Sequence, residues 1–268
     1  MDDCDAAFRL PQQRQKLILD RLAQEGQVLA ARLAEEFQTS EDTIRRDLRD
    51  LAAAGLCKRV YGGAIRLSPA STSARVRHEA MTSRTHRLGR RLAGLIVPGQ
   101  FVFMDAGTTV LAAATALPDG LAITVATHDP RIATALLGRE GIDLILLGGR
   151  VDPLSGAALG LHALRTAMEM RPDLLLLGTC ALNAAVGIGC FGVDDAEMKR
   201  TLVRSAGAVA TAVANEKLGT AAPYLVAASD ALSDLVVEAD APRAALAGLQ
   251  ALGVRIHPAD DITEDGKQ

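Results

Sequence analysis

Residues 39–55 read TSEDTIRRDLRDLAAAG. This stretch predicts one amphipathic helix, with residues typical of a helix start before it and of a helix end after it. Thr39 or Ser40 can accept a hydrogen bond from the first free backbone N–H groups, as residues before helices commonly do. Gly55 supplies the left-handed conformation that ends many helices. Apolar residues recur at i, i+4 and i+7 and therefore predict a single buried stripe. The stripe consists of Ile44, Leu48 and Leu51.

The opposite face of this helix carries three arginines, Arg45, Arg46 and Arg49. At about 100° per residue they fall together, away from the apolar stripe. Acidic residues four positions away can pair with them, so the charges alone also fit an ordinary solvated face. Arg45 and Arg49 are nevertheless a like-charge i,i+4 pair, which is unfavourable unless an anion lies between them.

A second amphipathic segment lies just upstream, at residues 28–37, with an apolar stripe of Leu29, Leu33 and Phe37. Only residues 38–40 separate it from the arginine-bearing helix. Two helices joined by so short a turn predict a helix-turn-helix, whose second helix enters the major groove of DNA. Another helix over residues 12–24 completes the predicted three-helix core.

Residues 56–65, LCKRVYGGAI, predict a β-hairpin around a Gly-Gly pair. A hairpin directly after a recognition helix is typical of a wing, which contacts phosphates or the minor groove beside that helix. Its candidate DNA contacts are Lys58, Arg59 and Tyr61. The net charge of the chain is −3, so any DNA contact must come from a local basic patch.

The segment from Arg14 to Ile65 resembles the winged helix-turn-helix of the DeoR family of bacterial transcriptional regulators. The most specific parts of the resemblance are SEDTIRRDL at residues 40–48 and RVYGGA at residues 59–64. The resemblance implies a transcriptional regulator, in most cases a repressor, that binds double-stranded operator DNA. The predicted DNA-binding residues are Thr39, Ser40, Thr43, Arg45, Arg46, Arg49, Lys58, Arg59 and Tyr61.

The composition favours an α/β protein for the rest of the chain. Of the 268 residues, 49% are hydrophobic but only 3% aromatic, so the core must be built from Ala, Val, Leu and Ile. That favours helices packed on a parallel sheet. The four cysteines form no C-x-x-C pair, so we expect neither a metal nor a cofactor. The N-terminus lacks signal-peptide features and no apolar run approaches a membrane span, which indicates a cytoplasmic protein without membrane association.

The small, polar stretch LSPASTS at residues 67–73 is the best domain boundary. We therefore predict a DNA-binding domain at residues 1–66, a linker at residues 67–74 and an effector-sensing domain at residues 75–268. Residues 75–91 contain six arginines but only one acidic residue. This run fits a solvated helix leading into the second domain, or further contacts with phosphate or with the effector.

From residue 100 onward, apolar runs of strand length alternate with helical patterns, which predicts a doubly wound α/β domain. Ligands of such sheets bind outside the carboxyl ends of the strands. The predicted strands are residues 101–105, 123–127, 143–147, 174–177, 209–213, 235–237 and 254–257. The predicted helices are residues 109–117, 131–139, 161–170, 195–206 and 242–252.

Two glycine-containing turns at predicted strand ends are candidate ligand sites. Residues 105–109, DAGTT, open a helix, so free N–H groups and threonine hydroxyls there form a cradle for an anion. Residues 147–150, LGGR, end another strand in the same way and add a guanidinium group. Each turn alone also fits a plain helix cap or tight turn.

Residues from about 75 to 237 resemble the effector domain of the same family. That domain is similar in fold to ribose-5-phosphate isomerase and typically senses phosphorylated sugars or related metabolites. The resemblance implies an effector pocket in which Lys199 and Lys217 contact the anion. Its predicted residues are Asp105, Gly107, Thr108, Thr109, Thr127, His128, Gly148, Gly149, Arg150, Lys199 and Lys217.

The chain also departs from the family pattern. Many members have Gly-Val-Asp-Gly after the fourth strand, where residues 178–181 here read GTCA without a carboxylate. His128 replaces the usual asparagine, and Thr85 replaces a lysine that many members carry. These departures bear on which metabolite the pocket recognises.

Two functions fit these features. The first is a regulator of carbohydrate or related catabolic genes, switched by a small anionic metabolite and acting as a dimer or larger homo-oligomer. The second is a sugar-phosphate isomerase-like enzyme with an accessory helical domain. Isomerisation needs a carboxylate base near the substrate carbons, and residues 178–181 offer none, so we assign no catalytic residue. A dinucleotide site is excluded because Gly107 lies in no G-x-G-x-x-G pattern.

Overall fold

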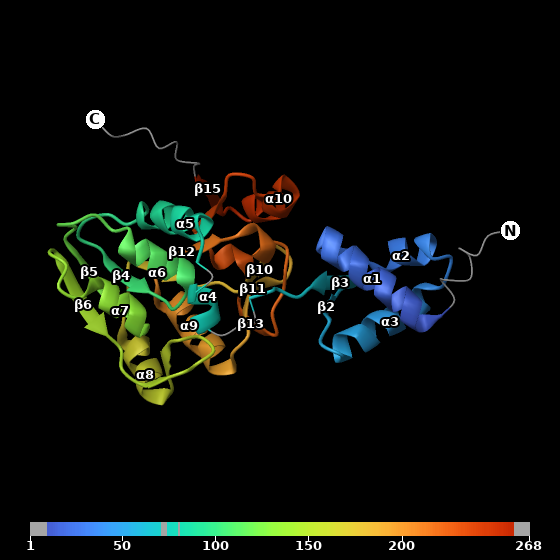
Figure 1. Ribbon diagram of the computed structural model, residues 1–268, viewed down its shortest axis with the longest axis horizontal. Coiled ribbons are helices and arrows are strands. Elements are labelled where there is room, and N and C mark those ends of the chain that lie inside the picture. Colours follow the sequence, from blue (N-terminus) through green and yellow to red (C-terminus); the bar gives the residue numbers. More distant parts are fainter. Residues whose placement is uncertain (1–9, 71–73, 80, 260–268) are drawn as a thin grey trace.

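The computed structural model describes residues 10–70, 74–79 and 81–259, which form an N-terminal helical body and a larger α/β body (Figure 1). Residues 1–9 of the predicted first domain, 71–73 of the predicted linker, and 80 and 260–268 of the predicted second domain lie outside the described residues. Within the described part of the chain, no helix is long and apolar enough to cross a membrane.

The N-terminal body is a winged helix-turn-helix. Its helices are α1 (Pro11–Glu25), α2 (Ala30–Glu36) and α3 (Glu41–Ala53). Its antiparallel sheet has the order β1-β3-β2 and consists of β1 (Gln27–Leu29), β3 (Gly63–Arg66) and β2 (Cys57–Val60). Ile18, Leu22, Ile44, Leu48 and Leu51 are buried between the helices, as the apolar spacing predicts.

The helix predicted from residue 28 begins two residues later, because Val28 and Leu29 belong to β1. Gly26 ends α1 with φ +77°, and the chain then pairs with β3, where a Cβ on Gly63 would lie 1.9 Å from the Val28 carbonyl oxygen. Only glycine permits this close approach. As a consequence Leu29 is 49% exposed instead of joining the predicted buried stripe.

The recognition helix α3 has the predicted end signals. The Ser40 hydroxyl accepts a hydrogen bond from the Thr43 N–H at 3.2 Å, and Gly55 follows the helix with φ +70°. A contact that was not predicted fixes this helix to α1. Arg14 donates two hydrogen bonds to Asp47, and both side chains are buried. The orientation of α3 therefore depends on a buried ion pair as well as on apolar packing.

The larger body is built on a seven-stranded parallel sheet with the order β15-β14-β12-β9-β4-β5-β6. Its strands are β4 (Phe101–Met104), β5 (Ile123–Thr127), β6 (Ile142–Leu146), β9 (Leu174–Leu177), β12 (Ala208–Val213), β14 (Asp234–Glu238) and β15 (Arg255–Ala259). The chain winds outward from β4 to β6, then restarts at β9 and winds the other way. The neighbours β4 and β9 are therefore the topological switch point, where doubly wound sheets bind ligands.

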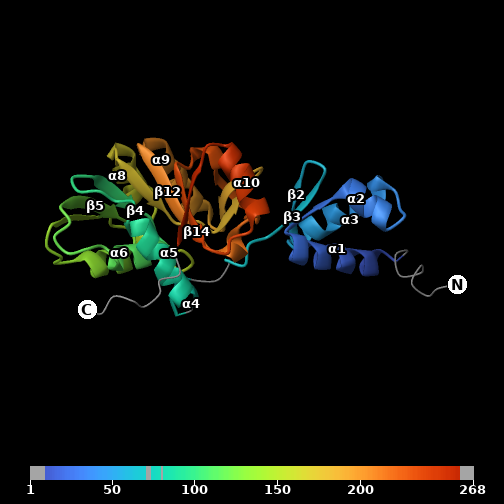
Figure 2. The same cartoon turned by 90° about the horizontal axis from the view of Figure 1, so that it is seen from above.

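Helices cover both faces of this sheet, so the predicted fold class is confirmed. Figure 2 shows α5 and α6 on one face and α8, α9 and α10 on the other. The helices of this body are α4 (Ala74–Glu79), α5 (Ser83–Ala93), α6 (Thr108–Thr115), α7 (Pro130–Leu136), α8 (Leu161–Glu169), α9 (Val193–Ser205) and α10 (Arg243–Ala251). Each face has its own apolar core, with Phe103 and Leu175 on one side and Val102 and Leu176 on the other.

Two small antiparallel units were not predicted. One is a three-stranded sheet in the order β10-β11-β13, formed by β10 (Ala181–Asn183), β11 (Gly187–Cys190) and β13 (Tyr224–Ala227). The other is a hairpin of β7 (Arg150–Val151) and β8 (Ala158–Leu159). Both lie on connections after strands of the main sheet, and both supply residues next to the pocket described below.

Candidate functional site

The first candidate surface is the arginine face of α3. Arg45, Arg46 and Arg49 are all exposed, on the side of the helix away from its buried stripe. Arg45 forms ion pairs with Glu41 and Asp42 of the same helix. Among the described residues, Arg46 and Arg49 form no ion pair with any acid of the protein. Two of the three guanidinium groups are thus available to an external anion.

The predicted DNA contacts of the wing differ in their surroundings, since two are exposed and one contacts the larger body. Tyr61, at the turn between β2 and β3, is fully exposed, and Arg59 on β2 is also exposed. Lys58 points toward the larger body instead, where its Nζ donates to the Ala222 carbonyl oxygen at 3.1 Å. Lys58 was predicted to contact phosphate, but in this structure it connects the wing with the second domain. Of the remaining predicted residues, Ser40 and Thr43 serve the α3 cap and Thr39 lies in the turn before it.

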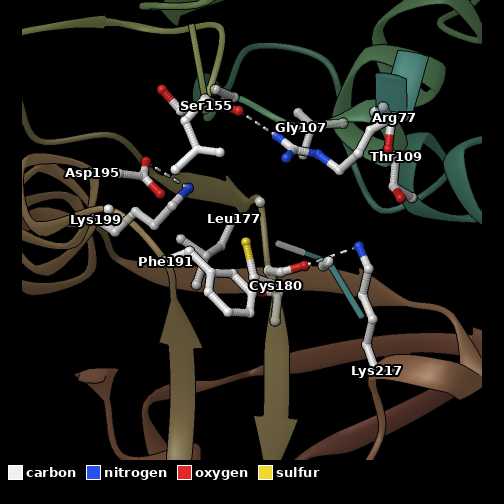
Figure 3. A pocket seen from close by; sticks show the side chains of 18 of the residues that line it. Arg77, Gly107, Thr109, Ser155, Leu177, Cys180, Phe191, Asp195, Lys199 and Lys217 are labelled. Carbon is white, nitrogen blue, oxygen red and sulfur yellow. Dashed lines mark hydrogen bonds and ion pairs between the residues drawn. The ribbon is translucent and has the colours of Figure 1, made fainter. Parts of the chain in front are cut away.

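The second candidate site is a pocket at the switch point of the sheet, shown in Figure 3. Gly107 after β4 and Gly178 after β9 form its floor, and a Cβ on Gly178 would lie 2.0 Å from the Ala106 carbonyl oxygen. Glycine therefore lets the two strand ends approach each other closely. The first turn of α6 adds Thr108 and Thr109, as the DAGTT pattern predicts.

A buried ionic network lies beneath this floor. Asp105 accepts a hydrogen bond from the Gly178 N–H at 2.8 Å and forms an ion pair with Lys199. Its other oxygen lies 2.9 Å from His128 Nε2. Asp105 and His128 are fully buried, and Lys199 is 2% exposed. The network links β4, β5, β9 and α9 at the point where the sheet changes direction.

The charges in this network offset one another. Burial alone would raise the pKa of Asp105, but the Lys199 ammonium and the His128 hydrogen bond outweigh it and lower that pKa to about 2. Burial likewise opposes the charge on Lys199, but Asp105 and Asp195 outweigh it and raise the pKa of the lysine. Lys199 lines the pocket, but its ammonium is already paired with Asp105 and Asp195, and its contact with an effector anion stays a prediction.

Asp195 is a second carboxylate beside Lys199 and is not among the residues predicted to bind the effector. It lines the pocket from the first turn of α9, with Oδ1 3.4 Å from Lys199 Nζ. Burial, reinforced by Asp105, outweighs the attraction of Lys199 and raises the pKa of Asp195. Across the part of the chain that the structure describes, no three His, Cys, Asp or Glu side chains are placed to hold a metal ion.

Two other cations lie on the opposite side of the pocket from Asp195 and Lys199 (Figure 3). Lys217 donates from Nζ to the Thr179 carbonyl oxygen at 3.2 Å, and its burial lowers its pKa. Arg77 donates to the Leu154 carbonyl oxygen at 3.1 Å. Arg77 belongs to the arginine run for which an effector contact was one of two expectations, and its position in the pocket favours that expectation.

Six predicted effector residues do not line this pocket, and one of them is Asp105, which lies beneath its floor. Thr127 and His128 are buried behind it, where the threonine hydroxyl donates to the Met104 carbonyl oxygen. Gly148, Gly149 and Arg150 follow β6, which is the edge strand and is separated from the switch point by β5. The pocket wall instead includes residues that were not predicted, among them Ser155, Cys180 and Phe191.

The segment that leaves the wing is attached to the pocket wall. Ser68 donates from its hydroxyl to the Cys180 carbonyl oxygen at 2.5 Å and from its N–H to the Ala221 carbonyl oxygen at 2.9 Å. Ala70, two residues further on, lines the pocket directly. The predicted linker is therefore bound to the second domain where it begins, with Ser68 in contact with the pocket-lining Cys180 and Ala70 in the pocket itself.

Comparison with protein families identifies both bodies. Residues 14–70 match the DeoR-like helix-turn-helix domain, and residues 81–239 match the DeoR C terminal sensor domain. The chain is similar to the glycerol-3-phosphate regulon repressor of Escherichia coli strain K12, with 30% identity over 77% of this chain and 82% of that protein. It is also similar to a putative aga operon transcriptional repressor of Escherichia coli O157:H7, with 27% identity over 91% and 92%.

Among solved structures, the fold is similar to ribose 5-phosphate isomerase A of Methanocaldococcus jannaschii. The two share 12% identity over 50% of this chain and 52% of that one, with a TM-score of 0.36. The two relatives from Escherichia coli carry the names of transcriptional repressors.

Proposed function

Because the chain belongs to the DeoR family of transcriptional regulators, we propose that it represses carbohydrate or related catabolic genes under the control of a small anionic metabolite. It binds operator DNA as a cytoplasmic homo-oligomer, with α3 in the major groove of each half-site. The observation that supports this proposal is that a short segment, residues 67–70, connects the domain with the exposed arginine face to the wall of a pocket.

On the DNA side, Arg46 and Arg49 supply the free cations, and Arg45 must exchange its ion pairs with Glu41 and Asp42 for contacts with DNA. Arginine is suited to both tasks, since its planar group binds phosphate or the edge of guanine through two hydrogen bonds. Arg59 and Tyr61 extend the contact into the wing. Lys58 is assigned to the domain connection.

On the effector side, the first turn of α6 presents free N–H groups and two threonine hydroxyls to the pocket, with Arg77 and Lys217 nearby. A helix start of this kind binds phosphate or carboxylate groups. The name of one relative refers to glycerol-3-phosphate, which agrees with a phosphorylated metabolite as effector. The effector binds here.

Residues 216–222 contact both the pocket and the wing, and they transmit the effect of the effector to the DNA-binding domain. Residues 216–222 begin beside the pocket-lining Lys217, and Ala221 and Ala222 accept hydrogen bonds from Ser68 and Lys58. An effector that binds two arrangements of this segment unequally shifts the balance between them, and the wing moves with it. This coupling gives the pocket a direct route to the orientation of α3.

The test begins with the operator, which is selected by incubating the full-length protein with genomic DNA fragments. Arg46→Ala and Arg49→Ala should each weaken operator binding by about 1–3 kcal/mol if the residue reads a base. Arg32→Ala, an exposed arginine on α2, is the matched control and should bind like the wild type. Wild-type affinity in both α3 variants would refute the docking of this helix.

A further inference from the structure

The edge strand β6 leaves an apolar surface exposed. It pairs with β5 on one side, and within the described part of the chain no strand lies on its other side (Figure 1). On β6, Ile145 is 37% exposed and Leu146 is 51% exposed. Val151 on β7 is 49% exposed, and Leu137, which follows α7, is 77% exposed. Strands of parallel sheets are normally buried on both faces, so this edge has the composition of a protein interior.

The backbone of β6 also offers unpaired hydrogen-bonding groups. The Gly141 carbonyl oxygen and the Leu147 N–H bond to β5. In a parallel pair, the backbone groups of every second residue point to the same side, so those of Leu144 and Leu146 point away from the sheet. Such a row is a template for another strand, and many proteins block it with lysine, proline or a bulge. The β6 sequence, IDLIL, has neither lysine nor proline, and its register with β5 is uninterrupted.

This edge is complementary to a second copy of itself in the antiparallel direction. With a two-fold axis at Ile145, the outward backbone groups of Leu144 meet those of Leu146 of the partner subunit and form hydrogen-bonded pairs. The two copies of Ile145 then form a pair without hydrogen bonds, in which side chains approach each other most closely. Both kinds of pair bury apolar side chains that the single subunit exposes.

Charges on either side of β6 agree with this arrangement. Glu140 and Arg150 lie at equal distances along the chain before and after Ile145, and both are exposed. Among the described residues, neither forms an ion pair. Antiparallel pairing about Ile145 places Glu140 of each subunit opposite Arg150 of the partner subunit, whereas parallel pairing would bring like charges together. The edge therefore carries both halves of a complementary charge pattern, which favours a second copy of this chain as its partner.

We propose that β6 is a subunit interface, at which two copies of the chain join their sheets in the antiparallel direction about a two-fold axis at Ile145. A two-fold interface uses the same surface on both subunits and covers both edges at once. It also supplies the symmetry with which two recognition helices bind two half-sites. This inference rests on the homo-oligomer of the proposed function and names the surface that forms it.

The first test compares the same substitution at the two ends of the sheet, by analytical ultracentrifugation of the full-length protein. Leu146→Lys places an ammonium group in the apolar interface, and should raise the dissociation constant of the assembly roughly tenfold or more. Leu252→Lys is the matched control, because this leucine is 43% exposed and follows α10, which packs near the opposite edge strand β15. Leu146→Lys should sediment with half the wild-type mass where Leu252→Lys keeps that mass. Circular dichroism shows whether both remain folded.

Charge reversal tests the direction and the register of the pairing. Glu140→Arg and Arg150→Glu each place like charges opposite each other at two positions of the interface. Each should raise the dissociation constant roughly threefold or more at low ionic strength. The double variant Glu140→Arg/Arg150→Glu restores opposite charges with their positions exchanged, so it should recover the wild-type value. High salt should reduce all of these differences.

The outcomes separate this inference from the proposed function. If Leu146→Lys keeps the wild-type mass, or if the double charge reversal dissociates as readily as the single variants, the interface at β6 is refuted. The proposed function stands in that case, provided that the wild type is an oligomer and binds its operator in gel-shift titrations. A wild type that is monomeric both alone and on its operator refutes this inference and the proposed homo-oligomer together.

Discussion

Removing Arg14 should detach the recognition helix from its support. Arg14 is 5% exposed and Asp47 is 3% exposed, and the guanidinium of α1 holds the carboxylate of α3 through two hydrogen bonds, one of them 3.1 Å long. Arg14→Met leaves Asp47 buried and unpaired, which costs about 3–5 kcal/mol. A domain of the size of residues 10–66 has a total stability of about 3–9 kcal/mol. The variant should therefore lose much of its folded N-terminal domain.

Hydrogen exchange of the full-length protein measures this loss locally. Amides of α3 should lose most of their protection in Arg14→Met, whereas those of the strands β4, β9 and β12 should keep it, because the ion pair belongs to the N-terminal core. Arg32→Met, on an exposed residue of α2, should exchange like the wild type.

The double variant Arg14→Met/Asp47→Leu makes the test specific. Replacing both members of a buried ion pair by apolar residues is often neutral or stabilising, so the double variant should recover most of the lost protection. The reasoning is refuted if Arg14→Met protects α3 like the wild type, or if the double variant is as unstable as the single one.

Three further predictions concern the second domain. Ser68→Ala removes a hydrogen bond to the pocket wall, so operator titrations should show a smaller effect of the effector on DNA affinity; an unchanged effect would refute the coupling route. The pKa of Asp105, about 2, lies below its ordinary value of 3.8, so its ion pair with Lys199 stabilises the fold above pH 4. That contribution of about 2 kcal/mol disappears as the pH falls from 4 to 2, and Asp105→Asn should flatten this part of a denaturation-against-pH profile. Gly178→Ala places a Cβ 2.0 Å from the Ala106 carbonyl oxygen, so it should destabilise the protein by about 1–3 kcal/mol and abolish effector binding in a thermal-shift assay.

The main sheet was predictable because buried parallel strands leave uninterrupted apolar runs in the sequence. The strands at residues 123–127 and 174–177 have the predicted bounds, and the strand predicted at residues 143–147 is displaced by one residue. The small sheet with β11 was not predictable in this way. Its sequence, GIGC, has two glycines, and its strand conformation depends on pairing with β13, more than thirty residues away.

The pocket was partly predictable. Strand-end reasoning located Gly107, Thr108 and Thr109, because a glycine turn that opens a helix has a chemical reason to bind anions. The same reasoning also selected Arg150, which does not line this pocket, because sequence alone could not show that β6 lies at the sheet edge. The order of strands is a property of the tertiary fold. The similar turns at residues 105–109 and 147–150 therefore lie at different places along the sheet, and only the first contributes residues to the pocket.

The electrostatic state of the pocket was beyond local sequence reasoning. Lys199 and Asp105 are 94 positions apart, and only the folded chain shows that they neutralise each other. Sequence reasoning found no carboxylate at residues 178–181, after the predicted fourth strand. Asp195 supplies one from α9, at a position where the sequence alone fits an ordinary acidic first turn of a helix.

The most direct test of the account measures operator affinity with and without an effector for the wild type and for Lys217→Met. An anionic metabolite that raises the melting temperature of the wild type should change its operator Kd about tenfold or more, which corresponds to a coupling free energy of about 1.4 kcal/mol. The effect should be lost in Lys217→Met, whose ammonium lines the pocket. An operator affinity that stays constant while the effector saturates the wild-type pocket would contradict the account.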